Sequence, residues 1–529
     1  MKKVSALLLA LLLAVGCMSA LADVNLPLVD EPLTLTCFME TDVKWSATKN
    51  SVAEVGSYQV IMGKTGITIE FNHPAAGEQK NKFNLMMNSG ATLPDMIYYN
   101  WSGVTGGAAK YVEDGTIVAL NEYLEEWAPN FLSYMEQYPD IRKQTVLDDG
   151  TYYMFPMIRL DEESGGGTWF KTAGFMLRQD WLDALDLEMP TTVEEFHDVL
   201  VAFKDGDPNG NGEADEIPFA TTYEYTEQLV SAFGVLYDFY CDGAEIKYGP
   251  LQDGFKQWVE TMREWYAEGL IDPEYATTDG TTLTSKVVSD TVGATYYQLN
   301  GGMGTWSNMM ADHESFDMEA MPWLKSDDDS IAYAATSDYN KVVVGPGVAI
   351  TSAAVENGHL EACIKFRDYF YSPEGVIESN FGIEGESYTI VDGEPIFTDA
   401  VLANDKGLTT TQALSQYALS ASNDAMVKTA KYFKQVTLLL PNQKASQAVW
   451  NQCDLSLLLP AMSFTSDEST FISEKMSEIE TYVDEHVLLM ITGQESMDNY
   501  DKFVSDIIDM GIESVTEIEQ AAYERYLAR

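Results

Sequence analysis

The stretch NKFNLMMNSGATLPDMIYYNW, residues 81–101, decides the class of fold. Its first half predicts a helix, because three apolar side chains recur at the spacing of one helix face: Phe83, Met86 and Met87. Ser89-Gly90 ends this helix, and the apolar run at 95–99 predicts a strand. TGITIEF, residues 65–71, predicts another strand just upstream. A strand, a helix and a strand joined by short links are typical of an α/β sheet.

The same pattern indicates where a ligand would bind. In α/β sheets, ligands lie beyond the carboxyl ends of the strands. Tyr99, Asn100 and Trp101 occupy such an end. Farther along the chain, LTLTCF at 33–38 predicts the first strand, and residues 467–529 predict a helical tail.

A capping box predicts the start of a long helix near residue 192. In such a box the side chains of Thr192 and Glu195 satisfy backbone N–H groups that the first helical turn leaves free. Apolar residues then recur at helical spacing up to Lys204. Just upstream, we expect Arg178 and Asp180 to form a local ion pair with a structural role.

Composition limits the classes of partner. The chain has 529 residues, which predicts two or three domains. Acidic residues outnumber basic ones by 83 to 31, so the formal net charge is -52. This charge repels nucleic acid and anionic lipid, and it favours a neutral ligand over a polyanionic one. After the N-terminal region, no apolar run is long enough for a membrane-spanning helix.

The N-terminus predicts export. Lys2 and Lys3 precede a short apolar run, which is typical of a signal peptide. Residues 1–22 form this peptide if cleavage follows Ala20-Leu21-Ala22. Alternatively, Ala14-Val15-Gly16-Cys17 is an imperfect lipobox, and Cys17 would then carry a lipid anchor. Both alternatives place the protein at the cell surface or in the extracellular space.

The remaining cysteines and the histidines show no metal or redox motif. Four cysteines lie far apart along the chain, without a CxxC pair: Cys37, Cys241, Cys363 and Cys453. Two disulfides would be compatible with this count, but buried free thiols in a large core are the favoured interpretation. No zinc motif such as HExxH occurs.

The loop DPNGNGEADEIP, residues 207–218, predicts a structural Ca²⁺ site. Ca²⁺ takes six to eight oxygen ligands, and a short loop supplies them by alternating ligand and spacer residues. The candidate ligands are Asp207, Asn209, Asn211, Glu213 through its backbone carbonyl, Asp215 and Glu216. A second register would begin at Asp205, with Gly210 sixth and Glu216 twelfth. The alternatives are Mg²⁺, which is disfavoured because it keeps several waters and rarely has a dedicated protein cage, and a solvated turn without an ion.

Several segments in one order resemble a known family. They include MLRQDWLDALDLEMPTTVEEF at 176–196, AFKDGDPNGNGEADEIP at 202–218 and YFYSPEGVIESNFGIEGESYTI at 369–390. Together with MMNSGATLPDMI at 86–97 and DGTYYMFP at 149–156, they resemble the extracellular solute-binding proteins of ABC importers, in the large oligosaccharide-binding branch.

The resemblance implies a two-lobed α/β fold of the periplasmic-binding-protein type, with a hinge and an interlobe cleft. It implies an oligosaccharide ligand, ABC permease subunits as partners, and a monomer. Members similar to the alginate-oligosaccharide binders hold Ca²⁺ in this same loop, away from the sugar, which favours the register that begins at Asp207.

We expect the lobes to alternate along the chain. Residues 23–160 are the first part of lobe 1, and residues 161–290 are the first part of lobe 2, including the calcium loop. Residues 291–350 would return to lobe 1, and residues 351–529 would form mainly lobe 2 and the C-terminal helices.

The candidate sugar-binding residues are aromatic and polar side chains near predicted strand ends and glycine-rich loops. Aromatic rings stack on the apolar faces of a sugar, while carboxylates and amides pair with its hydroxyls. Most aromatic residues of any chain belong to its core, which is the competing interpretation for each ring. The candidates are Trp45, Tyr99, Asn100, Trp101, Trp169, Tyr296, Tyr297, Trp306, Glu386 and Tyr388.

We expect a binding protein and not an enzyme. Glu384 and Glu386 form a carboxylate pair of the kind that glycosidases use, but nothing in the sequence singles them out among so many acidic residues. The alternatives are a binder of peptides or other small solutes, and a secreted, calcium-stabilised glycoside hydrolase or lyase.

Overall fold

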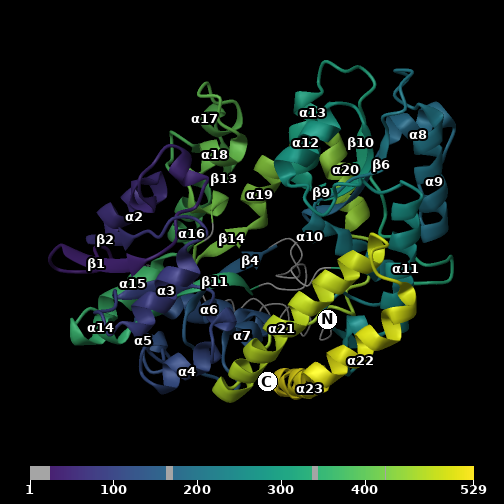
Figure 1. The fold of residues 1–529 in the computed structure, drawn as a ribbon. Coiled ribbons are helices and arrows are strands. Elements are labelled where there is room, and N and C mark those ends of the chain that lie inside the picture. Colours follow the sequence, from purple (N-terminus) through teal and green to yellow (C-terminus); the bar gives the residue numbers. More distant parts are fainter. Residues whose placement is uncertain (1–23, 162–170, 336–342, 423) are drawn as a thin grey trace, which may run out of the picture. The chain divides into compact units, whose positions relative to one another are not determined.

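The computed structural model describes residues 24–161, 171–335, 343–422 and 424–529. The chain divides into two compact units (Figure 1). Unit 1 comprises the chain up to Trp101 together with Tyr111–Ile158 and Gly345–Lys428. Unit 2 comprises Ser102–Lys110, Arg159–Val344 and Thr429–Arg529. Within the described residues, no helix is both long and apolar enough to cross a membrane.

A six-stranded sheet forms the centre of unit 1, and its strands follow the order β14-β4-β11-β3-β1-β2. The central strands β1 and β3 are parallel, β2 is parallel to β1, and β11 is antiparallel to β3. The strands are β1 (Leu33–Phe38), β2 (Ile67–Asn72), β3 (Met96–Tyr99), β4 (Phe155–Leu160), β11 (Val343–Ile350) and β14 (Val427–Thr429).

The predicted strand, helix and strand are confirmed as β2, α3 (Gln79–Asn88) and β3. The other helices of this unit are α2 (Gly56–Thr65), α5 (Leu124–Trp127), α6 (Pro129–Gln137), α7 (Pro139–Thr145), α14 (Ser352–Glu356), α15 (Leu360–Tyr369), α16 (Pro373–Phe381), α17 (Asp399–Leu402) and α18 (Thr410–Leu414). Helix α4 (Gly107–Glu113) lies where the chain passes from unit 2 back to unit 1, and β12 (Tyr388–Val391) forms a hairpin with β13 (Glu394–Phe397).

A buried ion pair joins three segments of unit 1. Arg367 on α15 donates from Nη2 to Oδ1 of Asp424 at 3.0 Å, and Tyr58 on α2 donates to Oδ2 of the same carboxylate at 2.6 Å. Arg367 and Asp424 are 2% and 1% exposed. The Arg367 guanidinium also donates to the backbone oxygen of Ala425 and stacks on Phe370 at 4.3 Å. Because burial removes water from both charges, each charged group is stabilised mainly by the opposite charge of its partner.

Unit 2 has its own sheet of four strands in the order β10-β5-β9-β6. The strands are β5 (Ala173–Arg178), β6 (Ile217–Phe219), β9 (Val292–Gln298) and β10 (Met318–Ala320); β7 (Phe239–Asp242) and β8 (Glu245–Tyr248) form a separate hairpin. The helices are α8 (Gln179–Leu185), α9 (Val193–Gly206), α10 (Tyr223–Thr226), α11 (Asp253–Ala267), α12 (Gly280–Val288), α13 (Thr305–Met309), α19 (Ala430–Thr437), α20 (Pro441–Trp450), α21 (Ser466–Ile491), α22 (Tyr500–Met510) and α23 (Ile512–Ala528).

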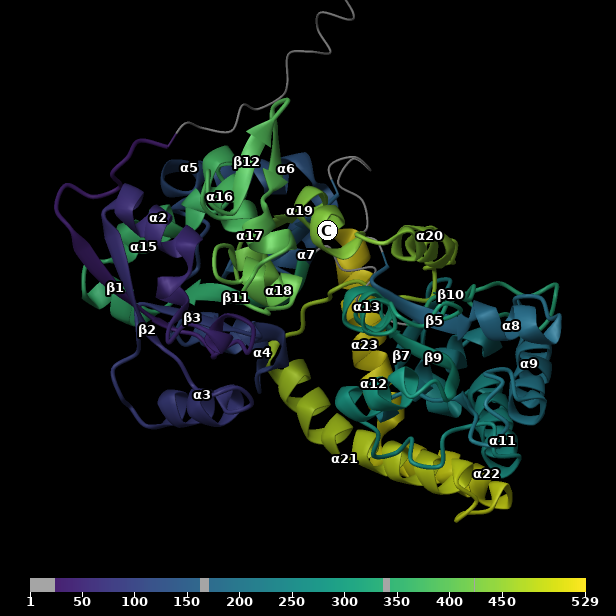
Figure 2. The same ribbon diagram turned by 90° about the horizontal axis from the view of Figure 1, so that it is seen from above.

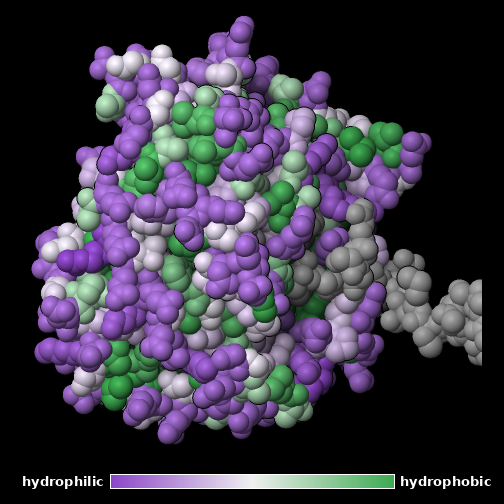
Figure 3. Space-filling view, turned by 90° about the vertical axis from the view of Figure 1, so that its right-hand side faces the viewer, coloured by the Kyte–Doolittle hydropathy of each residue, from purple (hydrophilic) through white to green (hydrophobic). Residues whose placement is uncertain are grey.

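The helices at the C-terminus confirm the predicted helical tail. Helix α21 packs on α11, α22 and α23, and Figure 2 shows α21 and α22 in succession along one side of unit 2. On the face of the molecule that carries α8, α9 and α11, Figure 3 shows mostly hydrophilic side chains, with apolar residues in separate patches. This surface agrees with the strongly acidic composition.

Trp450 fastens α20 to the sheet of unit 2. Its ring is 0% exposed, and its Nε1 donates to the backbone oxygen of Phe175 on β5 at 2.9 Å. Its own backbone oxygen accepts a hydrogen bond from Nε1 of Trp323 at 3.0 Å. A Cβ atom on Gly174 would lie 2.4 Å from the indole, so the neighbouring strand position needs glycine for close approach.

The boundaries of the units differ from the expected lobes in the middle of the chain. Residues 291–344 belong to unit 2 instead of returning to lobe 1, and residues 345–428 belong to unit 1. The physical reason is sheet pairing: β9 and β10 both pair with β5 of unit 2, whereas β11 pairs with β3 of unit 1. Four cysteines are free thiols, as favoured from the sequence: Cys37, Cys241, Cys363 and Cys453.

Candidate functional site

The loop after α9 begins with a backbone reversal at Asp207. The predicted capping box is present, and the helix continues to Gly206, two residues beyond the expected end. Asp207 has φ 48°, a left-handed conformation that Asp tolerates better than most residues. Gly210 and Gly212 have φ 69° and 77°, so three reversals within six residues fold the loop back on itself.

Side-chain oxygens of the loop turn toward its own backbone. The Asp207 carboxylate accepts from the backbone N–H of Gly212 at 3.2 Å, and Asn209 Oδ1 accepts from that of Asn211 at 3.0 Å. Asn211 Oδ1 in turn accepts from the backbone N–H of Glu213 at 2.6 Å. Three of the predicted ligand residues, Asp207, Asn209 and Asn211, therefore direct a side-chain oxygen toward the backbone of the loop.

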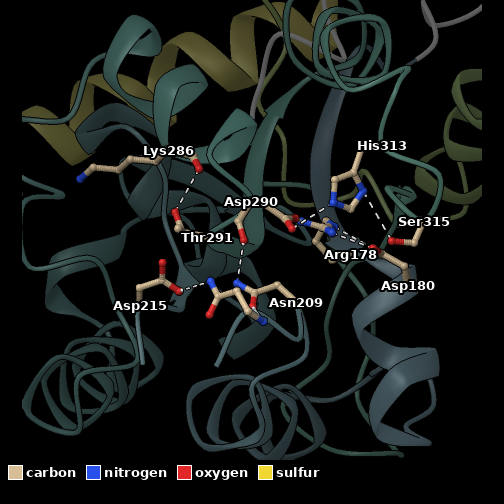
Figure 4. Close-up of polar contacts among 10 residues, drawn as sticks. Arg178, Asp180, Asn209, Asp215, Lys286, Asp290, Thr291, His313 and Ser315 are labelled. Carbon is tan, nitrogen blue, oxygen red and sulfur yellow. Dashed lines mark hydrogen bonds and ion pairs between the residues drawn. The ribbon is translucent and has the colours of Figure 1, made fainter. Parts of the chain in front are cut away.

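Asp290 ties this loop to the rest of unit 2 (Figure 4). Its backbone oxygen accepts from Asn209 Nδ2 at 3.0 Å, and its carboxylate pairs with Arg178 at 2.5 Å and His313 at 3.2 Å. The expected ion pair of Arg178 with Asp180 is also present, at 2.6 Å. The loop is thus anchored to β5 through a charged network.

Glu216 is the residue of the loop whose polar contacts are incomplete. Its Oε1 atom is buried and has no hydrogen-bond partner in the part of the chain that the structure describes. Burial raises the pKa of this carboxyl, and the negative charges of Asp215 and Asp207 raise it further. A buried oxygen without a partner beside two carboxylates fits a cation, which would supply the missing contact.

No group of three or more His, Cys, Asp or Glu side chains is arranged to hold a metal ion among the described residues. The predicted ligand set includes two Asn side chains and a backbone carbonyl, so its carboxylates are only Asp207, Asp215 and Glu216. Asn211 Nδ2 donates to Asp215 Oδ1 at 3.1 Å in this structure.

The candidates at the end of β3 form an aromatic cluster within unit 1. The Tyr99 ring stacks on Phe83 at 3.9 Å, and Trp101 meets Phe83 and Tyr111 edge-on, each at 5.7 Å. Trp101 is 1% exposed and donates from Nε1 to the backbone oxygen of Gly347. Asn100 lies between these rings in sequence and is exposed.

The other candidates of unit 1 lie apart from that cluster in sequence. Trp45 is buried and contacts His73, with ring centroids 5.0 Å apart. Glu386 is exposed on the turn before β12, whereas Tyr388 is 5% exposed and lies against Phe381. Glu384 is exposed as well, so neither carboxylate of the predicted pair lies in a buried pocket.

The candidates of unit 2 gather around the glycine-rich turn at Leu299–Gly304. Trp306 is 0% exposed, donates to Thr284 Oγ1 at 3.1 Å and lies 5.3 Å from the ring of Tyr297. A Cβ atom on Gly302 would lie 2.6 Å from the ring of Tyr297, so this position needs glycine to leave room for that ring. Tyr296 is also buried, while Tyr297 is half-buried. Trp169 and Cys17 lie outside the described residues.

A second group of aromatic and acidic residues in unit 2 has no local signature in the sequence. Tyr223, Tyr237, Trp258 and Tyr275 line one cavity together with Glu227 and Asp484. These residues come from segments far apart along the chain. The sequence of each segment by itself has the pattern of an ordinary amphipathic element. A surplus of tyrosine and tryptophan was the only sequence signal for such a site.

Two α/β units, each built from several separate segments of one chain, are typical of the two-domain periplasmic-binding-protein fold. The model of the bacterial extracellular solute-binding protein family matches residues 51–377, and the chain belongs to this family.

Relatives and solved structures agree with this assignment. The fructooligosaccharide ABC transporter substrate-binding protein FusA of Streptococcus pneumoniae is 29% identical over 335 residues, which is 61% of this chain and 59% of FusA. The alginate-binding protein AlgQ2, solved without calcium ion, has TM-score 0.74 at 23% identity, covering 94% of this chain and 99% of AlgQ2. FusA with kestose, and an EF-hand mutant of FusA with fructo-nystose, each have TM-score 0.73, at 23% and 22% identity; each match covers 94% of this chain and 99% of FusA.

Proposed function

We propose that this protein is the extracytoplasmic substrate-binding component of an ABC importer and that it captures a neutral oligosaccharide. The observation that carries the proposal is the sequence match with FusA, whose name specifies fructooligosaccharide, within a family of extracellular solute-binding proteins. The net charge of -52 supports a neutral sugar over a uronide, because a polyanion would approach against this field.

The proposed mechanism is binding without turnover. A ligand that binds the closed state of the two lobes more tightly than the open state shifts the population toward closure, and the closed protein is delivered to the permease. Among the predicted contacts, Asn100, Glu386 and Tyr297 have exposed or half-buried side chains. The buried rings of Trp45, Trp101 and Trp306 would reach a sugar only after their present neighbours moved. Their role as stacking platforms remains a prediction.

A thermal-shift screen tests the function. The protein would be heated in Ca²⁺ buffer with neutral oligosaccharides including kestose, with uronides, with amino sugars and with peptides. A ligand present at 100 times its Kd adds about 2.7 kcal/mol of apparent stability, which such a screen detects easily. We expect a shift from a neutral oligosaccharide.

The other outcomes of the screen separate the alternatives. A shift from a peptide and from none of the sugars would contradict the proposal and indicate peptide uptake. New reducing ends in an incubation with the sugar that binds would show a hydrolase. X-ray scattering without compaction on ligand addition would contradict the closure mechanism.

We also propose that the loop of Asp207 to Glu216 holds Ca²⁺ as a structural ion. The residues that would hold it are Asp207, Asn209, Asn211, Glu213 through its backbone carbonyl, Asp215 and Glu216. The proposal is supported by the buried Oε1 of Glu216, which has no partner among the described residues, and by the oxygens of Asp207 and Asn211 that turn toward the loop backbone. The ion would balance the carboxylate charges and fix the loop against Asp290.

Removing calcium should lower stability. We expect a chelator to reduce the free energy of unfolding by about 2.7 kcal/mol when Ca²⁺ had been present at 100 times its Kd, and by more at higher concentrations. Asp207→Ala should abolish the calcium-dependent part of the stability, whereas Asp205→Ala should retain it, because only the second register uses Asp205. Each variant is compared with and without calcium, so strain from Ala at φ 48° cancels.

The measurement is thermal unfolding with and without chelator, followed by sugar binding at low temperature. Sugar binding by the folded, chelated protein should persist. Equal melting of the parent with and without calcium would contradict the metal proposal. Loss of calcium dependence in Asp205→Ala alone would favour the other register.

A further inference from the structure

Unit 2 contains a cavity of about 220 Å³ whose lining combines aromatic, acidic and aliphatic side chains. Four rings line it, and they come from α10, the segment before β7, α11 and the segment after α11: Tyr223, Tyr237, Trp258 and Tyr275. Trp258 and Tyr275 are each 1% exposed, whereas Tyr223 is 36% exposed. The cavity therefore has a buried interior and is accessible from solvent beside Tyr223.

The rings are arranged as two pairs, one stacked and one edge-on. Tyr223 and Tyr275 lie 6.4 Å apart with an interplanar angle of 29°, and Tyr237 meets Trp258 edge-on at 5.8 Å and 84°. The faces of aromatic rings carry negative electrostatic potential, so a group of rings around a small space attracts an organic cation. Trp gives the strongest interaction of this kind, followed by Tyr.

The charges around the cavity are of one sign. Glu224, Glu227 and Asp484 line it, and none of its described lining residues is Lys, Arg or His. Burial raises the pKa of Glu227 to about 7, and the charges of Asp484, Asp238 and Glu224 contribute to this rise. The Asp484 carboxylate accepts from Tyr237 at 2.7 Å. Unbalanced negative charge at a partly buried carboxylate is relieved by a bound cation.

Two polar atoms on the lining residues lack hydrogen-bond partners. They are Nε1 of Trp258 and the hydroxyl of Tyr275, both buried, and neither has a partner among the described residues. Buried groups of this kind are uncommon in folded proteins. The indole N–H is a donor only, so it requires an acceptor such as a hydroxyl oxygen. A ligand that satisfies the site would thus carry an oxygen as well as a positive charge.

We propose that this cavity binds a small hydroxylated alkylammonium ion. The ammonium group would lie among the four rings, next to the carboxylates of Glu227 and Asp484. The hydroxyl group would accept from Trp258 Nε1 or pair with Tyr275. This is a second ligand site, argued independently of the proposed function: none of the candidate sugar-binding residues is among its described lining residues, all of which belong to unit 2.

Choline and its carbon isostere provide a direct test. Choline chloride and 3,3-dimethyl-1-butanol have the same shape and hydroxyl group and differ in the positive charge. We expect isothermal titration calorimetry to show saturable binding of choline and at least tenfold weaker binding of the neutral alcohol. Tetramethylammonium, which lacks the hydroxyl, should bind more weakly than choline.

A pair of matched variants locates the site. Glu227→Gln removes a lining carboxylate and should weaken choline binding at least tenfold. Glu485→Gln removes an exposed carboxylate next to Asp484 that does not line the cavity, and its affinity should stay within threefold of the parent. Thermal unfolding of both variants would establish that they are folded.

Three results would overturn the proposal. They are the absence of choline binding, equal binding of choline and the neutral alcohol, and equal affinities of the two variants. Binding of a neutral monosaccharide that Glu227→Gln weakens, with no binding of choline, would assign the cavity to a sugar instead. None of these results bears on the oligosaccharide screen, so failure here and failure of the proposed function are distinguishable.

Discussion

Replacement of Asp424 by Ala should lower the free energy of unfolding by about 3–5 kcal/mol. The substitution would leave the guanidinium of Arg367 buried without its countercharge, and it would leave the Tyr58 hydroxyl without its acceptor. The guanidinium cannot escape the cost of burial by losing its proton, because an arginine side chain stays protonated in proteins. Urea unfolding followed by circular dichroism would measure the effect.

An exposed ion pair on the same helix supplies the control. Lys365 and Glu361 on α15 form an i,i+4 pair whose side chains are 33% and 55% exposed. Glu361→Ala should change the free energy of unfolding by less than about 0.5 kcal/mol. The double replacement Arg367→Met with Asp424→Leu should cost less than Asp424→Ala alone, because it removes both charges. A loss below 1 kcal/mol for Asp424→Ala would contradict the role assigned to the pair.

Trp450→Ala should cost a similar amount, about 3–5 kcal/mol, for a different reason. The substitution removes a fully buried indole and leaves a cavity between α20 and the sheet of unit 2. It also removes the donor to the Phe175 backbone oxygen. Trp450→Phe keeps most of the volume and should lose less. Urea unfolding of the two variants separates the packing contribution from the hydrogen bond.

A double-mutant cycle tests the close approach of Gly174 to this ring. Gly174→Ala should destabilise the parent, because its Cβ would lie 2.4 Å from the indole. In the Trp450→Ala background the same change should be nearly neutral, since the obstructing ring is gone. Equal costs of Gly174→Ala in both backgrounds would contradict the packing described here.

The sequence predicted those features that depend on neighbouring residues. The strand, helix and strand around Phe83, the capping box of Thr192 and the ion pair of Arg178 with Asp180 all arise within short segments, and all three are present. The backbone of the loop at Asp207 also folds as its glycines require. In each case hydrophobic periodicity or turn chemistry determines the local structure.

Features that depend on distant segments were not predictable in this way. Trp101 and Trp306 follow strand ends as expected, yet Tyr111 covers one and Tyr297 packs beside the other. Whether a ring at a strand end is open to a ligand depends on which remote side chains cover it. The same limit applies to the unit boundaries, because only pairing across the sheet shows that β9 stays with β5 while β11 joins β3.

The position of β11 in the sheet of unit 1 has a consequence for the nascent chain. Strand β11 lies between β3 and β4 in the sheet. It begins only at Val343, whereas β3 ends at Tyr99 and β4 ends at Leu160. During synthesis, β1, β2 and β3 emerge long before β11. The edge of β3 that later pairs with β11 therefore stays unpaired until β11 has been made. Such late, long-range closure slows folding and leaves an edge open to association with other chains.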